Sequence, residues 1–429
     1  MSIDAPLLPL EAARDRMLAA LEPLGVEAVD VEAAVGRVVA APVVARVTMP
    51  PWANSAMDGF AVRTADVAVA SAARPVELLV VGEVSAGHAP PGRVSAGSTM
   101  RILTGAMVPE GADAIVPVEQ TDAAWGVAEL PTRVGIRAAV RSGDHIRAAG
   151  SDITAGQALA DVGQVVHPAT VGVLIAAGHR DVVVFRRPRV TVISTGDELV
   201  APGRPLGPGQ IHDSNGPMLA ALAADAGATT ERVTAVTDDL ATVARTLETA
   251  IARSDVVLTS GGVSLGAHDV VRVALAARGR LEVWRVAVQP GKPLAFARAT
   301  AASPDDAREV LLFGLPGNPV SSFVTFELFV RPVLRRLGGQ RDPTGRPVRR
   351  VRLAEAVSKH DERRAFLRVT LHPDPDRPGH QVARLAGGQG SHVLSALAAA
   401  DALAVVPEAV RDLPAGAEIE VWPLYPEGS

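Results

Sequence analysis

Apolar positions between residues 189 and 337 form short runs that alternate with stretches of helical periodicity. The runs predict strands at 189–193, 231–236, 255–258, 281–288 and 310–313. Helical patterns lie between and after them, at 213–225, 239–251, 270–275 and 319–337. This alternation is typical of βαβ units, so residues 186–338 are predicted to form a central, doubly wound and mainly parallel α/β sheet.

The rest of the chain is richer in strand patterns. Residues 49–141 carry closely spaced strands separated by Gly and Pro turns, which predicts an inserted β-rich domain. The flanking segments 1–48 and 142–185 each contain one helical pattern, and we expect them to form a discontinuous N-terminal α/β domain. Strand patterns return after Gly339, so residues 345–429 are predicted to form a small β-barrel-like domain.

Four predicted post-strand loops carry glycines, hydroxyls or acids: Ser194–Glu198, Asp238–Asp239, Thr259–Asp269 and Gly314–Ser321. Loops after parallel strands share one edge of a sheet, where ligands of such sheets bind. Glycines let the backbone approach a ligand, and helix N-termini attract anions. The loops therefore favour a site for phosphate and metal. Ordinary turns and helix caps are the alternative, above all at Asp197, Asp238 and Asp239.

Composition narrows the function classes. Hydrophobic residues make up 48% of the 429 residues, and the net charge is −5, which disfavours a nucleic-acid or anionic-membrane surface. The chain has no cysteine, no signal-peptide pattern and no apolar run near the ~20 residues of a membrane helix, so a cytoplasmic protein is expected. Lys292 and Lys359 are its two lysines. Lys292 lies in a Pro/Gly turn, where a compact ammonium suits an oxyanion.

Several familiar chemistries do not fit the sequence. The Walker and dinucleotide-binding glycine patterns are absent, and the histidines are too scattered to predict zinc. Residues 262–266 match the G-x-S-x-G pattern of serine hydrolases, but Ser264 lies several residues past the predicted strand. Carboxylates that hold Mg²⁺ near phosphate-binding amides remain the favoured chemistry, with Glu198, Asp238 and Asp269 as candidate ligands.

Six motifs, taken together and in this order, are similar to those of one known family. The chain resembles the molybdopterin molybdenumtransferases (MoeA), which are related to the E domain of gephyrin. The motifs lie at 54–59, 101–106, 194–199, 259–269, 290–293 and 314–321.

The resemblance implies an enzyme that inserts molybdate into adenylylated molybdopterin, with Mg²⁺-dependent release of AMP. It also implies an α/β domain like that of molybdopterin adenylyltransferases and a homodimer whose site is shared between subunits. Possible partners are a molybdopterin adenylyltransferase and recipient molybdoenzymes. The implied catalytic residues are Asp58, Glu198, Asp238 and Asp269, of which the last three bind metal. The implied substrate-binding residues are Thr104, Asp152, Ser194, Thr195, Gly196, Asp197, Ser260, Gly261, Gly262, Ser264, Lys292, Pro316, Asn318, Pro319, Ser321, Arg368 and Ser391.

The chain departs from the family pattern at Gln289 and around residues 147–152, where relatives often carry more arginine and a glutamate. Gln289 stands where many relatives have lysine, so one positive charge is missing at the implied molybdate site. Two other functions stay open on the sequence: a molybdopterin adenylyltransferase that uses the shared α/β domain, and a non-catalytic pterin carrier or scaffold.

Overall fold

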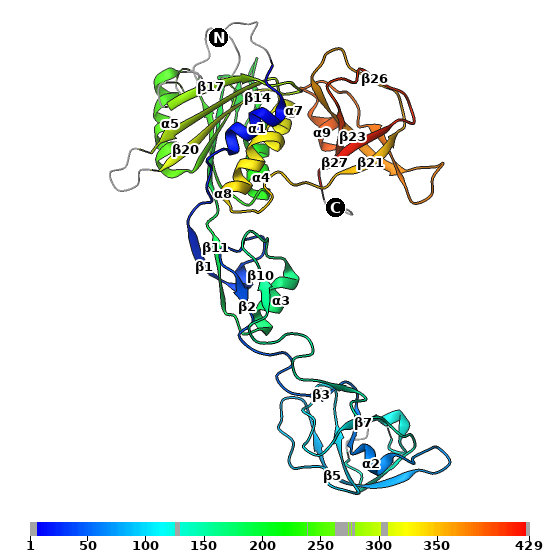
Figure 1. Ribbon diagram of the computed structural model, residues 1–429. Helices are drawn as coiled ribbons and strands as arrows, with labels where there is room; N and C mark the ends of the chain where they lie inside the picture. Colours follow the sequence, from blue (N-terminus) through cyan, green and yellow to red (C-terminus); the bar gives the residue numbers. More distant parts are fainter. Residues whose placement is uncertain are drawn as a thin grey trace.

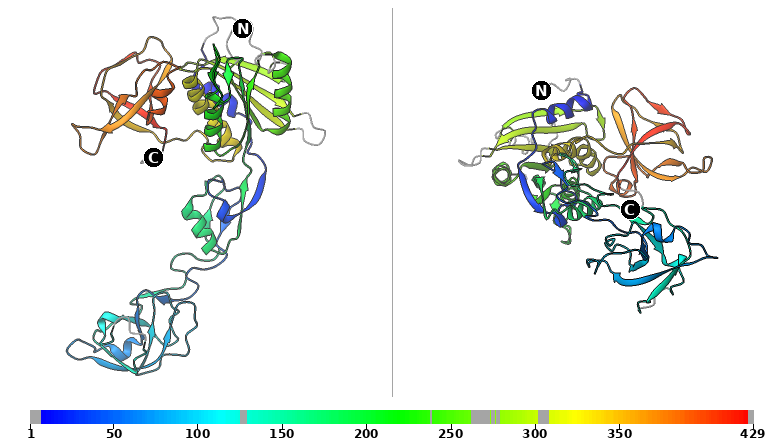
Figure 2. Two further views of the ribbon diagram at one scale, coloured as in Figure 1. Left: turned by 180° about the vertical axis from the view of Figure 1, so that it is seen from behind. Right: turned by 60° about the horizontal axis from the view of Figure 1, so that its bottom comes forward.

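The chain is elongated, with its domains arranged from one end to the other (Figure 1). The computed structural model describes residues 7–124, 129–237, 239–261, 279–301 and 308–425, together with residues 273 and 276. The α/β domain and the C-terminal β domain lie side by side at one end, and the inserted domain lies at the other (Figure 2). A small N-terminal domain connects them.

A six-stranded sheet forms the centre of the α/β domain, in the order β15-β12-β16-β20-β19-β17. Its strands are β12 (Arg189–Thr195), β15 (Thr229–Val236), β16 (Val256–Ser260), β17 (Gly279–Arg285), β19 (Pro293–Thr300) and β20 (Glu309–Leu315). β15, β12, β16 and β20 pair in parallel, whereas β19 is antiparallel to both its neighbours. The prediction of a mainly parallel sheet is confirmed, with β19 as the reversed strand.

Helices cover both faces of this sheet because its strands alternate apolar side chains between the faces. Val192 and Leu258 pack in the core with α1 (Leu10–Leu18), α4 (Asn215–Asp225), α7 (Pro319–Thr325), η3 (Phe326–Val330) and α8 (Arg331–Leu337). Ile193 and Val257, one residue away, pack on the other face with α5 (Leu240–Arg253). Two short strands, β13 (Leu199–Val200) and β14 (Ile211–His212), pair in the connection before α4.

The inserted domain is built on a five-stranded sheet in the order β7-β4-β6-β5-β8. Its elements are β4 (Gly59–Val62), α2 (Thr64–Val67), β5 (Val76–Val84), β6 (Ser98–Ile102), β7 (Ala114–Pro117), η2 (Val118–Gln120) and β8 (Arg133–Ile136). The pair β3 (Asn54–Ser55) and β9 (Ile146–Arg147) lies where the chain enters and leaves this domain.

Two antiparallel pairs form the connecting N-terminal domain, and both join its two chain segments. They are β1 (Val26–Asp30) with β11 (Asp181–Phe185), and β2 (Val43–Val44) with β10 (Ala158–Ala160). η1 (Val31–Ala33) and α3 (Pro168–Ala176) complete it, and α3 is followed by Gly178 at φ +91°. The exact domain boundaries stay predictions.

The C-terminal domain is a closed barrel, as the sequence predicted. Its strands pair in the cycle β23-β24-β21-β27-β25-β23. The elements are β21 (Arg349–Leu353), β22 (Val357–Ser358), β23 (Arg364–Pro373), β24 (Gln381–Leu385), α9 (Leu394–Ala398), β25 (Ala402–Val406), β26 (Asp412–Leu413) and β27 (Glu418–Pro423). Closure pairs every barrel strand on both sides.

One predicted strand is wrong. Residues 281–288 do not form a single strand, because β17 ends at Arg285 and β18 (Val288–Gln289) leaves the sheet. β18 pairs in parallel with β23 of the barrel instead, through Val288 with Arg364 and Gln289 with Ala365. This pairing joins the two domains by main-chain hydrogen bonds. None of the described helices is long and apolar enough to cross a membrane.

Candidate functional site

Four parallel strands end side by side at the carboxyl edge of the α/β sheet. Ser194 of β12 pairs with Ser260 of β16, which pairs with Leu315 of β20, and Thr195 lies opposite Val236 of β15. The loops that follow these strands therefore begin at one edge of the sheet, as predicted. Ser194, Thr195 and Ser260 belong to the strands rather than to the turns, so sheet pairing holds their backbone in place.

Glycines continue two of these strands in conformations that other residues rarely adopt. φ is +145° at Gly196 and +95° at Gly261. A Cβ added to Gly261 would lie 3.2 Å from the carbonyl oxygen of Thr195. The N–H of Gly261 donates to Leu315 O at 3.1 Å. The Gly261 loop therefore approaches the Thr195 backbone closely, whereas a Cβ at Gly196 would collide with the Glu198 side chain of its own loop.

Asn215, the first residue of α4, connects two of the strand ends. Its Nδ2 donates to Ser260 Oγ at 2.9 Å and to Gly317 O at 2.6 Å. Buried Asp213, two residues before α4, accepts the Gly216 N–H at 2.9 Å. Sequence reasoning missed that Asn215 also belongs to the site. The available signal was an asparagine opening the helix that follows the Ser194–Glu198 loop.

Three buried polar atoms at this edge have no hydrogen-bond partner within the described part of the chain: Ser194 Oγ, Asp213 Oδ2 and Asn215 Oδ1. Leaving such an atom unpaired costs about 1–3 kcal/mol. Native proteins keep few of them, and functional sites are one place where they occur. Their clustering supports a ligand site at this edge.

A second site lies between the α/β domain and the barrel, in a cleft of about 500 Å³. It brings together four residues that the motif resemblance implied for molybdate: Lys292, Ser321, Arg368 and Ser391. Lys292 comes from the turn after β18 and Ser321 from α7, whereas Arg368 comes from β23 and Ser391 from the loop before α9. The cleft exists only because the two domains pack together.

The cleft is positively charged. Lys292, Lys359, His360, Arg363 and Arg368 line it, and none of its described lining residues is an aspartate or glutamate. Its volume falls in the range of small-molecule sites. Asp361, outside the lining, pairs with Arg363, but the other cations of the wall have no carboxylate beside them in the described lining, so the cleft attracts anions.

Arg368 is the most unusual of these cations. It is 1% exposed, and its Nη2 donates to the carbonyl oxygens of Gly388 at 3.0 Å and Gly390 at 3.2 Å. No carboxylate of the described residues forms a salt bridge with it, and its Nε has no partner there. Burial lowers the pKa of Arg368 to about 10. A buried guanidinium without an acid is a candidate ligand for an anion.

The turn before β19 holds Lys292 at the cleft. Gly291 adopts a φ of +109°, and a Cβ there would lie 2.6 Å from Thr325 Cγ2 of α7. Gln289, the last residue of β18, contributes a neutral amide whose Oε1 is buried without a hydrogen-bond partner among the described residues.

The two sites are contiguous through the loop between β20 and α7. At one end of this loop Gly317 O accepts from Asn215 at the sheet edge. At the other end Asn318 Nδ2 donates to Ser391 Oγ at 3.0 Å, and Val320 N donates to Ser391 O at 3.1 Å. A ligand held at the sheet edge therefore lies next to one held in the cleft.

Comparisons with known proteins find matches over most of this chain. Residues 8–178 match the MoeA N-terminal region (domains I and II), 191–336 a probable molybdopterin-binding domain, and 350–424 the MoeA C-terminal region (domain IV). Molybdopterin molybdenumtransferase 2 of Mycobacterium tuberculosis is 41% identical over 397 residues, which are 91% of this chain and 93% of that relative. A molybdopterin molybdenumtransferase of Nostoc sp. is 37% identical over 399 residues, 93% of this chain and 88% of that relative.

This chain belongs to the molybdopterin molybdenumtransferase family. A crystal structure of the molybdopterin biosynthesis MoeA protein from Pyrococcus horikoshii agrees, with 32% identity and a TM-score of 0.79 over 98% of this chain and 100% of that one. Membership confirms the resemblance carried by the six sequence motifs.

Other residues expected from the molybdopterin molybdenumtransferase motifs lie in the inserted domain and next to it. Asp58 and Thr104 come together there, since Asp58 Oδ1 accepts from Thr104 N at 2.6 Å and from Thr104 Oγ1 at 2.7 Å. Asp152 is exposed, near the junction with the N-terminal domain, where its N–H donates to Met49 O at 3.2 Å. Figure 1 places the inserted domain at the end of the chain opposite to the α/β sheet.

The proposed magnesium ligands are only partly described. Glu198 and neighbouring Asp197 are exposed in the loop after β12. Asp238 and Asp269 lie outside the described residues, as do Gly262 and Ser264 of the glycine-rich turn and the hydrolase-like pattern. The described residues contain no group of three His, Asp or Glu side chains that could hold a metal. Glu198 fits as one oxygen ligand for Mg²⁺.

Proposed function

We propose that this chain is a molybdenum insertase that transfers molybdenum from molybdate to molybdopterin. One observation carries the proposal: a cation-lined cleft, with no carboxylate among its described lining residues, lies directly beside a glycine-rich sheet edge. The cleft suits a tetrahedral oxyanion and the edge suits a phosphate-bearing ligand. The names of the relatives, molybdopterin molybdenumtransferases, support this substrate pair.

Each site residue then has a physical task. Lys292 and Arg368 neutralise the charge of molybdate, and the hydroxyls of Ser321 and Ser391 donate hydrogen bonds to its oxygens. At the sheet edge, the backbone around Gly196, Gly261 and Gly317 leaves room for the pterin ligand. Asn215 holds two of these loops in register, so the pterin is presented to the cleft. Further proposed contacts at the edge come from Ser194, Thr195, Asp197, Ser260, Pro316, Asn318 and Pro319.

The finer proposal is that the pterin arrives adenylylated and leaves after Mg²⁺-dependent release of AMP. Glu198 would be one metal ligand, with Asp238 and Asp269 as the others, and Gly262 and Ser264 would bind phosphate. The metal, when bound, would neutralise charge at the phosphoanhydride. The recipients of the product would be molybdoenzymes, and a molybdopterin adenylyltransferase would supply the substrate.

We further propose that Asp58, Thr104 and Asp152 complete the site of a second subunit. The support is that the inserted domain, which carries Asp58 and Thr104, lies at the end of the chain opposite to the α/β sheet (Figure 1). Mixing inactive Asp58→Ala with inactive Lys292→Ala should then restore activity. Random pairing of the two chains gives about a quarter of sites with both residues intact. No recovery after mixing and exchange would contradict the shared site.

The direct test supplies purified protein with adenylylated molybdopterin, Mg²⁺ and molybdate. We expect AMP release and a product that reconstitutes an apo-molybdoenzyme, both lost in Lys292→Ala. Failure of both readouts in the parent would refute an insertase. ATP-dependent adenylylation by this chain alone would support the adenylyltransferase instead. Full molybdoenzyme activity in cells that carry only Asp269→Ala would support a carrier or scaffold.

A further inference from the structure

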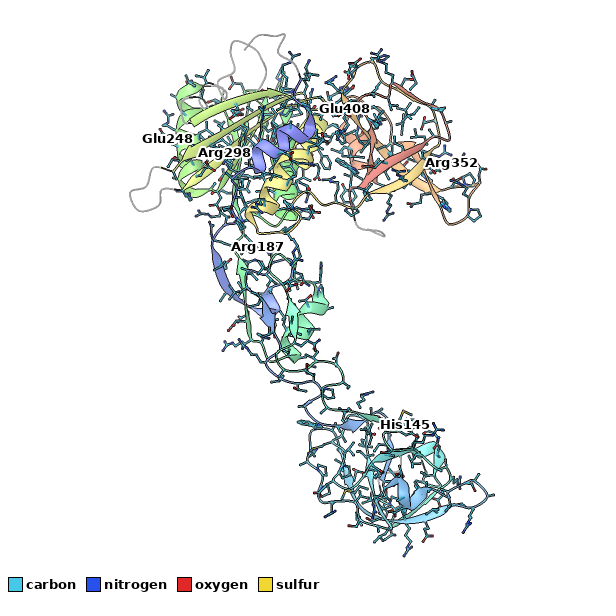
Figure 3. All side chains as sticks on the ribbon, in the orientation of Figure 1. His145, Arg187, Glu248, Arg298, Arg352 and Glu408 are labelled. Carbon is cyan, nitrogen blue, oxygen red and sulfur yellow. The ribbon has the colours of Figure 1, made fainter. Side chains whose placement is uncertain are left out.

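The chain's second lysine lines the cleft from the barrel side. Lys359 follows β22 and is only 8% exposed. Its Nζ donates to the carbonyl oxygens of Arg363 at 2.6 Å and Glu408 at 2.9 Å. Glu408, labelled in Figure 3, lies where the barrel meets α1. An ammonium has three N–H donors, so these carbonyls leave one for another partner.

The acids near Lys359 are occupied by arginines. Asp361 accepts from Arg363 Nε at 2.8 Å, and Glu362 pairs with Arg411 at 3.1 Å. Glu408 likewise pairs with Arg364 at 3.1 Å. Among the described residues no carboxylate forms a salt bridge with Lys359.

Burial without an acid partner is costly for an ammonium. Burial lowers the pKa of Lys359, which shows that its surroundings favour the charged form less than water does. Two carbonyls could equally be bound by a neutral donor. Arginine also outnumbers lysine twentyfold in this chain, 40 to 2, yet both lysines line one cleft. A bound anion would explain why a compact cation is kept there.

We propose that Lys359 is an oxyanion-binding residue of this cleft, which holds a tetrahedral dianion from the barrel while Lys292 holds it from the α/β domain. The inference rests on the proposed function, since it takes the cleft as the molybdate site. The inference gives Lys359 a role in specificity. With cations from both domains, the cleft selects a dianion over a monoanion of the same shape. The attraction grows with the charge of the ligand.

The test compares molybdate, a dianion, with perrhenate, a tetrahedral monoanion, by isothermal titration of the full chain. Lys359→Met should weaken molybdate about tenfold but perrhenate only about threefold, because halving the ligand charge halves the Coulomb term. Lys359→Arg keeps the charge and should stay within about threefold of the parent for both. Arg350→Met removes an exposed barrel charge outside the cleft and should change neither affinity.

The outcomes separate this inference from the proposed function. A parent that binds no molybdate refutes the cleft as its site, and the role of Lys359 with it. A parent that binds molybdate, with Lys359→Met binding it equally well, refutes Lys359 alone. Equal weakening of molybdate and perrhenate also refutes it, since loss of structure would lower both alike.

Should Lys359→Met fail to fold, the pH dependence of molybdate affinity decides. Asp361, Glu362 and Glu408 favour the charged lysine and Arg411 opposes it, while burial outweighs them. As the pH rises, the parent should therefore lose affinity before Lys359→Arg, whose guanidinium stays charged. Coincident profiles would refute the proposal.

Discussion

Replacing Arg368 by methionine should weaken oxyanion binding strongly while leaving the protein folded. The side chain is buried, has no acid partner among the described residues, and donates to the carbonyls of Gly388 and Gly390, of which Gly390 lines the cleft. Methionine fills a similar volume without the charge. The substitution therefore separates the anion-binding role of Arg368 from its packing role.

The stability change follows from two opposing contributions. A pKa lowered to about 10 corresponds to a penalty of about 3 kcal/mol against the charged form. Screening by solvent in the open cleft reduces this penalty to about 2 kcal/mol. Losing the bonds to Gly388 and Gly390 costs about 2 kcal/mol, because those carbonyls can turn to water in the cleft. The free energy of unfolding should thus change by less than about 1 kcal/mol.

The binding change should be much larger than the stability change. Removing one close, partly desolvated cation should cost about 2 kcal/mol of molybdate affinity, which is about thirtyfold in Kd. Urea unfolding and titration with molybdate measure the two quantities on the same samples, with Arg368→Lys as the charge-retaining control. A destabilisation above about 3 kcal/mol with unchanged Kd would show that Arg368 is purely structural, and would refute the reasoning.

Three further substitutions test the structure. Asp255→Asn should lower the free energy of unfolding by about 2 kcal/mol at pH 7, because three arginines within 4 Å lose their acid. Burial alone would raise the pKa of Asp255, but hydrogen bonds from the arginines hold this pKa below its usual value. The stability difference between parent and variant is therefore fully present above the pKa of the unfolded state, and it disappears as the pH falls through the pKa of the folded state. Glu327→Gln should lower the free energy of unfolding by about 3 kcal/mol, measured from the urea midpoint, because buried Arg331 loses its main acid partner. Adding Arg331→Met to this variant should restore the stability, and no restoration would contradict the reasoning. Gly291→Ala should weaken molybdate binding more than it lowers Tm, since its Cβ collides with Thr325 and displaces the turn; unchanged affinity would contradict it.

Much of the fold could be predicted from the sequence, because it depends on local patterns. The strand β12 and the helix α5 follow from apolar periodicity and from Asp239, whose carboxylate accepts the N–H of Thr242 at 2.8 Å. The reversed strand β19 could not be predicted, since strand direction depends on pairing partners. β18 was missed for the same reason: residues 288–289 look like a continuation of β17, and only the barrel gives them a partner.

The candidate site, like the fold, could be predicted only in part from the sequence. The residue types were visible in the sequence: glycines and hydroxyls after strands, a rare lysine in a Pro/Gly turn, and motifs that resemble one family. Tertiary structure alone decided which of them meet. Lys292 and Arg368 share a cleft because β18 pairs with β23, and Asn215 joins the site because α4 begins at the sheet edge. The burial of Arg368 and Lys359, neither of which has a salt-bridge partner among the described residues, depends on residues far apart in the chain and so is decided only by folding.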